Sequence, residues 1–133
     1  MAYVRSGNSG GGGGGLTKTV LWTNPNPSAN MGSATLTLSD NVNNYDYIGF
    51  KYQGRTAYTP TQIYEVIVPI DTWNKSNTSS SDTKGPFEAT LGYNYSGFIY
   101  RTVAKASDTS VYVSKRGSYS DSACAPLEIY GLK

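Results

Sequence analysis

The chain has 133 residues, with twelve tyrosines, two tryptophans, three phenylalanines, one cysteine and no histidine. This length fits one domain, and without histidine a Ser-His-Asp triad, a Cys-His pair and any zinc site that needs imidazole are excluded. The net charge is +2, and the scattered basic residues form no stripe of the kind that binds nucleic acid.

The first fifteen residues differ in composition from the rest of the chain. Met1, Ala2, Tyr3, Val4 and Arg5 form a short, mildly apolar head with no apolar core of a signal peptide after it. Ser6–Gly15 holds seven of the fifteen glycines and predicts a flexible tether with an r.m.s. reach of roughly 16–18 Å. We interpret residues 1–15 as a docking peptide plus tether. The alternative is that several copies meet at the glycine run, since glycine permits close contact between chains.

Residues 16–133 predict a single β-domain. Apolar and polar residues alternate with period two between turn-forming stretches, and no window shows the 3.6-residue stripe of a helix. Eight strands are expected, at Leu16–Trp22, Ser33–Ser39, Tyr45–Gln53, Gln62–Ile70, Phe87–Tyr93, Gly97–Ala104, Ser110–Ser114 and Leu127–Leu132. Eight short antiparallel strands favour a jelly-roll-like β-sandwich.

The alternation also assigns side chains to the two faces of each strand. The expected inward residues are Val20, Trp22, Ala34, Leu36, Leu38, Ile48, Phe50, Tyr52, Tyr64, Val66, Val68, Phe87, Ala89, Leu91, Val111, Val113, Leu127 and Ile129. Tyr45, Tyr47 and Ile63 are expected on an outward face, where an interface between subunits would cover them. The Asn-Pro pairs at residues 24–27 predict a break after the first strand, because proline cannot continue the ladder.

No metal or cofactor is predicted. A group of oxygen-bearing side chains suits calcium, but its spacing matches no calcium loop, and turn formation explains the same residues. This group is Asp40, Asn41, Asn43, Asn44 and Asp46. The glycine run is not followed by Lys-Ser or Lys-Thr, so it is no phosphate loop.

No catalytic residue is predicted either. Glycoside hydrolysis needs only two carboxylates, and Glu65, Glu88 and Glu128 are the candidates on strands. They alternate with inward positions, so we interpret them as solvated charges on the strand faces. The single cysteine, Cys124, lies between two alanines and is interpreted as a small filler of the interior, in a chain made in a reducing cytoplasm.

Aromatic residues beside polar side chains in the predicted loops suggest a sugar-binding patch, because rings stack on sugars while amides, carboxylates and guanidinium groups bind hydroxyls. The candidates are Trp73, Tyr93, Tyr95, Arg116, Tyr119 and Asp121. The alternative is that these rings fix loops to the sandwich or pack between subunits.

Three stretches carry a resemblance to a known family. Val20–Pro27, Ala34–Leu38 and Asn44–Ile48 resemble a domain found in tail and other virion proteins of bacteriophages, common in phages of gut and other Gram-positive bacteria. The final residues, Pro126–Lys133, are similar to the short closing strand of that group. The resemblance spans Val20–Lys133.

The resemblance implies a β-sandwich module of a phage fibre, baseplate or capsid, usually trimeric and often in contact with the host surface. We therefore expect a non-enzymatic virion protein, homotrimeric, whose tail-side form binds host-surface polysaccharide. The alternative is a capsid decoration or head-fibre protein whose residues 1–5 dock on other virion proteins. No shaft repeats precede the domain, which departs from the pattern of long fibre subunits. Neither nucleic acid nor membrane is an expected partner.

Overall fold

The computed structural model describes residues 3–5, 15–27, 29, 31–53, 63–75, 89–94, 98–114 and 124–133, with the backbone alone for residues 3–5, 89–94 and 98–100. Within these ranges the chain forms β-strands, one 3-10 turn and one short helix. In chain order these are β1 (Tyr3–Arg5), β2 (Lys18–Thr23), β3 (Ala34–Thr37), η1 (Val42–Asn44), β4 (Tyr47–Gln53), β5 (Ile63–Pro69), α1 (Ile70–Trp73), β6 (Ala89–Asn94), β7 (Phe98–Ser107), β8 (Ser110–Val113) and β9 (Pro126–Leu132).

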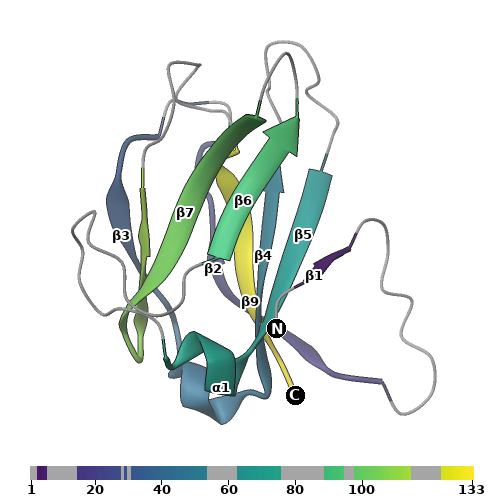
Figure 1. Ribbon diagram of the computed structural model, residues 1–133. Coiled ribbons are helices and arrows are strands. Elements are labelled where there is room, and N and C mark those ends of the chain that lie inside the picture. The colour runs from purple at the N-terminus through teal and green to yellow at the C-terminus, as the bar shows by residue number, and fades with distance from the viewer. Residues whose placement is uncertain are drawn as a thin grey trace.

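Two antiparallel sheets lie face to face (Figure 1). One has the order β1-β5-β4-β9-β2 and the other the order β3-β8-β7-β6. The strands with described side chains form four strands of the first sheet and three of the second, while β1 and β6 are the outermost strand of each. The expected antiparallel, mostly β, sandwich-like fold is confirmed.

The core lies between the sheets and is built from the period-two side chains. From β4 it takes Ile48, Phe50 and Tyr52, and from β5 it takes Val66 and Val68. β9 of the same sheet adds Ile129, and the second sheet supplies Leu36, Val103, Val111 and Val113 from the opposite side. Every expected inward residue of β4 and β8 is therefore confirmed, while on β9 Ile129 belongs to the core and Leu127 is only half-buried.

The first strand differs from the prediction. Val20 is 43 % exposed, whereas Leu21 is 3 % exposed and belongs to the core. The pairing of β2 with β9 shifts register between Val20 and Trp22, so a bulge interrupts the alternation there. Trp22 still packs against the core, half-buried. The expected inward position of Val20 is wrong because strict alternation cannot foresee an extra residue.

The Asn-Pro break is confirmed as a turn. β2 ends at Thr23, and the side chain of Asn24 accepts a hydrogen bond from the backbone N–H of Asn26 (2.8 Å). The Asn24 amide also donates to the carbonyl of Pro126 (2.9 Å). The turn is thus tied to the start of β9, at the far end of the sequence.

Two glycines of the central strand pair each face a tyrosine ring. Gly49 on β4 lies opposite Tyr130 on β9, and a Cβ at residue 49 would overlap that ring. A Cβ at Gly131 would overlap the ring of Tyr45. Glycine is needed at both positions because the ring occupies the space of the missing side chain.

We expect Gly49→Ala and Gly131→Ala each to lower the free energy of unfolding by about 1–3 kcal/mol, because the added methyl group displaces a packed ring. Gly32→Ala is the matched control, since no atom lies within 4 Å of a Cβ there, and it should stay within about 0.5 kcal/mol of the wild type. Urea unfolding followed by tryptophan fluorescence measures all three. Equal stability of Gly49→Ala and Gly32→Ala would contradict the ring contact.

Candidate functional site

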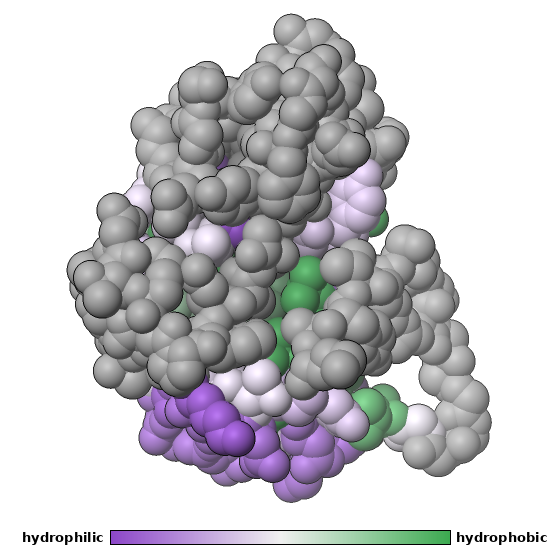
Figure 2. All heavy atoms as spheres, viewed as in Figure 1, coloured by the Kyte–Doolittle hydropathy of each residue, from purple (hydrophilic) through white to green (hydrophobic). Residues whose placement is uncertain are grey.

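A groove of about 450 Å³ opens at the end of the sandwich where α1 and η1 meet. Its volume is within the range of small-molecule sites. Figure 2 shows that hydrophilic side chains gather at this end of the molecule. The groove is lined by Asn43, Tyr45, Asp46, Tyr47, Pro69, Ile70, Asp71 and Asn74.

Local sequence explains both walls. On one side the Asn41 side chain accepts a hydrogen bond from the backbone N–H of Asn43 (2.8 Å) and so caps η1. On the other side Pro69 ends β5, and α1 begins at the next residue. The Ile70 N–H donates to the carbonyl of Asp46 (2.9 Å), which fixes the two walls to each other.

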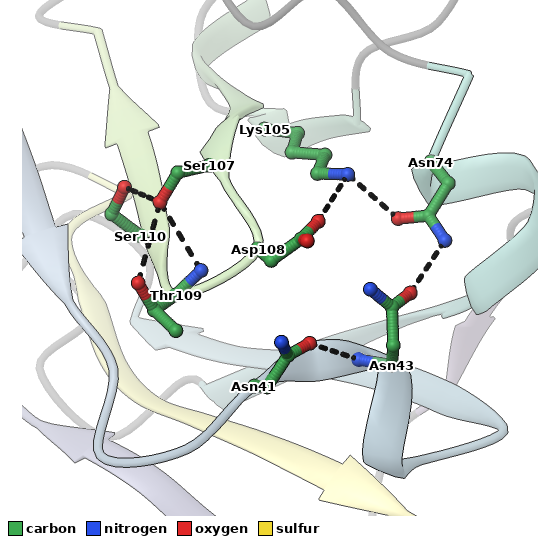
Figure 3. Close-up of polar contacts among 8 residues, drawn as sticks. All are labelled: Asn41, Asn43, Asn74, Lys105, Ser107, Asp108, Thr109 and Ser110. Atoms are coloured by element: carbon green, nitrogen blue, oxygen red, sulfur yellow. Dashed lines mark hydrogen bonds and ion pairs between the residues drawn. The ribbon is translucent and has the colours of Figure 1, made fainter.

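A chain of polar contacts runs behind the groove (Figure 3). The Asn74 amide donates to Oδ1 of Asn43 (2.7 Å), and its own Oδ1 accepts from Nζ of Lys105 (3.0 Å). Lys105 also forms an ion pair with Asp108 (2.7 Å) at the turn between β7 and β8. The network therefore ties α1 and η1 to a hairpin of the second sheet. It also fixes the orientation of both groove amides.

Two carboxylates near the groove are held in their charged form. The hydroxyl of Tyr45 donates to Asp40 (2.9 Å), and this bond, with the N–H of Asn41, lowers the pKa of Asp40. Desolvation and the same carboxylate raise the pKa of Tyr45. The hydrogen bond and charge of Lys105 lower the pKa of Asp108. The turn from residue 40 to 45 and the β7–β8 turn are thus both stabilised by charged hydrogen bonds.

The groove combines two aromatic residues, Tyr45 and Tyr47, with the amides of Asn43 and Asn74. Each amide carries two N–H hydrogens and a carbonyl, so an amide held from behind still offers polar atoms to a ligand. Asp46 and Asp71 add acceptors, and the described residues that line the groove include no basic side chain. This arrangement suits a polyhydroxylated ligand that is neutral or carries an amine.

Trp73 was expected at the surface as a stacking platform, and this expectation is wrong. It is fully buried in α1 and packs on Phe50, with ring centroids 5.4 Å apart. The polar composition of the following residues suggested a loop, but the four-residue helix turns this ring into the core. The alternative, a ring that fixes a segment to the sandwich, describes Trp73 correctly.

The other predicted ligand residues are not tested by side-chain geometry. Tyr93 lies on β6 opposite Ile99, and its side chain is outside the described residues. Tyr95, Arg116, Tyr119 and Asp121 also lie outside the described residues, as does Glu88.

The head was expected to stand apart from the domain as a docking peptide. Met1 and Ala2 lie outside the described residues, but the backbone of Tyr3, Val4 and Arg5 forms β1, which pairs with β5. This strand was not predicted, because three residues before a glycine run carry too short a pattern to identify one. The docking role of residues 1–5 stays a prediction.

The oxygen-rich residues considered for calcium instead build the turn. Asp40 accepts from the N–H of Asn41 (2.7 Å) and the amide of Asn44 (2.9 Å). In the part of the chain that the structure describes, no three or more acidic, cysteine or histidine residues form a group that could hold a metal ion.

Glu65 and Glu128 are half-buried and engaged on the outer face of the first sheet. Both lie opposite Lys51, one on each side of β4. Glu65 accepts from the hydroxyl of Tyr130 (2.6 Å), and Glu128 forms an ion pair with Lys18 (2.5 Å). Both are strand-face charges as expected, but they are half-buried and paired rather than solvated.

Cys124 lies in the interior, as expected. It is fully buried, with a positive φ of 55°, and burial raises the pKa of its thiol to about 11, partly offset by the charge of Arg101. A thiol in this environment is a poor nucleophile.

Sequence reasoning missed most of the groove. The sequence pattern places Tyr45 and Tyr47 only on an outward face that suits a subunit interface, and it gives Asp71 and Asn74 no role. The polar residues just after the apolar strand Ile63–Pro69 were the available clue, since strand ends are common places for binding side chains. Pairing them with Asn43 required the tertiary structure.

No protein-family model, curated protein or solved structure matches this chain. Among the described residues, neither helical segment has the length or apolar character needed to cross a membrane.

We expect the free energy of unfolding to fall as pH decreases below about 4, the ordinary carboxyl range. Asp40 and Asp108 have lowered pKa values in the folded chain, so the unfolded chain takes up protons first, and their stabilisation is present above that range and lost below it. In Asp108→Asn this acid-dependent decrease should be smaller. Urea unfolding between pH 7 and pH 2.5 measures it.

Thr109→Ala is the control, because it alters the same exposed turn without removing a titratable group. It should keep the wild-type pH dependence. The ion pair has no role in acid stability if Asp108→Asn loses as much stability on acidification as the wild type.

Proposed function

We propose that this chain is a structural protein of a bacteriophage particle that acts as a receptor-binding module and holds a host-surface glycan without altering it. The groove at the end of the sandwich carries the proposal, since it brings Tyr45 and Tyr47 together with two oriented amides. The location on a phage particle is supported by a resemblance to phage tail and virion domains, which covers Val20–Pro27, Ala34–Leu38 and Asn44–Ile48.

The lining of the groove also suggests the kind of glycan. Asp46 and Asp71 disfavour polymers with phosphate or carboxylate groups, because like charges repel across a shared site. A neutral sugar, or one with a free amine, can accept hydrogen bonds from the amides and donate to the carboxylates. The proposed ligand is therefore a neutral or amine-bearing polysaccharide of the bacterial surface.

The proposal includes a homotrimer on the virion and jelly-roll-like connectivity. In support of the latter, β2 pairs with β9 in one sheet and β3 pairs with β8 in the other. Such nested pairs, in which early strands meet late ones, are a feature of Greek-key folds.

A second candidate is a capsid decoration or head-fibre protein. The observation that favours it is β1, a short strand separated from the domain by a glycine-rich sequence. A segment of this kind can anchor a domain that projects from a shell. In the structure it lies on β5, so docking requires it to leave that edge or to bind together with it.

On an array of bacterial surface polysaccharides, we expect the wild type to bind neutral or amine-bearing glycans. Tyr47→Ala and Asp71→Ala should each weaken binding about tenfold, because each removes contacts worth on the order of 1–2 kcal/mol. Thr35→Ala is the matched control, exposed on β3 and outside the groove lining. Urea unfolding verifies that each variant is folded.

Four results would reject this proposal or part of it. Absence of glycan binding by the wild type rejects the adhesion function and favours decoration. Unchanged binding by both groove variants rejects the site. A preference for phosphate-bearing polymers rejects the charge argument, and shortened polymer products would make the protein an enzyme.

For the second candidate, particles assembled with a chain lacking residues 1–5 should not carry the domain. A chain in which five Gly and Ser residues replace Met1–Arg5 controls for length. Quantitative mass spectrometry of purified particles measures occupancy. Wild-type occupancy of the truncated chain would exclude residues 1–5 as the anchor.

A further inference from the structure

β5 has the composition of a strand with a neighbour on each side. Val66 and Val68 belong to the core, while Ile67, between them, is only 3 % exposed without belonging to that core cluster. Glu65 is the only charged residue from Ile63 to Pro69. A long apolar strand left open at the edge of a sheet would recruit strands from other chains.

β1 covers this edge over a short length. Tyr3, Val4 and Arg5 lie opposite Ile67, Val66 and Glu65 in antiparallel register. In Figure 1, β1 is the outermost strand beside β5, and residues 6–17 separate it from β2 in the sequence. β1 therefore pairs with only three of the seven residues of β5.

The hydrogen bonds of this pairing are the same whether β1 comes from its own chain or from another. The sequence that connects β1 to β2 therefore decides whether β1 pairs within its own chain or with another chain. This sequence includes Ser6–Gly15, which is rich in glycine. A short linker of this composition gives an effective concentration in the millimolar range. When copies are crowded together, as on an assembled particle, the local concentration of neighbouring chains can reach the same range. The β1 segment of a neighbour can then compete with the chain's own β1 for the β5 edge.

We propose that the β5 edge is an interaction surface for a second copy of this chain, which inserts its own Tyr3–Arg5 as the outermost strand. Exchange of a terminal strand forms an oligomer without any contact that the monomer lacks. Each exchanged strand keeps the β5 edge covered. The proposal rests on the pairing of β1 and does not depend on glycan binding.

Disulfide trapping between two differently labelled chains tests the exchange. Arg5→Cys on one chain and Glu65→Cys on the other place thiols at directly opposed positions, where Cβ atoms lie about 4.5–5.5 Å apart, close to disulfide range. The two full-length variants are mixed near millimolar concentration and oxidised. Non-reducing mass analysis should show a covalent heterodimer. Cys124, being buried with a raised pKa, should not compete.

Arg5→Cys mixed with Lys51→Cys is the control, because Lys51 lies one strand further in, opposite Glu65, roughly 10 Å from the position of β1. Tyr3→Cys with Ile67→Cys gives a second opposed pair should Glu65→Cys prove unstable. The proposal is overturned if the double variant Arg5→Cys, Glu65→Cys cross-links only within single chains. It is equally overturned if the control pair yields as much heterodimer as the opposed pair, or if no pair cross-links.

Discussion

The contact between Tyr45 and Gly131 organises the end of the molecule that carries the groove. Because residue 131 has no side chain, the ring lies directly on the central strand β9. From there its hydroxyl binds Asp40, whose carboxylate also receives the N–H of Asn41. The same Asn41 caps η1 and so sets the position of Asn43 in the groove wall. A glycine near the end of an interior strand thus leaves room for the tyrosine ring on which this wall of the groove is built.

The second sheet contributes to that site from behind. Lys105 on β7 is buried yet charged, and it satisfies its donors with Asp108 and with Asn74 beyond the end of α1. A buried ammonium group is tolerated only where such partners surround it. The polar network therefore serves two roles, since it compensates a buried charge and orients the groove amides.

The sequence alone predicts the β-class and most of the core. Period-two alternation is visible within a few residues, and it places every second side chain on the face that the opposite sheet buries. The prediction is wrong at Val20, because a bulge in β2 changes which side chains point into the core. It is also wrong at Trp73, because a four-residue helix follows Pro69. The groove could not be foreseen. Asn43 and Asn74 are 31 positions apart, and only the closed sandwich brings their amides into contact.

The position of the groove determines how a mechanical load would enter the domain. Its walls follow β3 of one sheet and β5 of the other, and Lys105 on β7 connects the wall after β5 to the second sheet through Asn74. If a polymer binds there as proposed, tension on it would pass into both sheets rather than into a single edge strand.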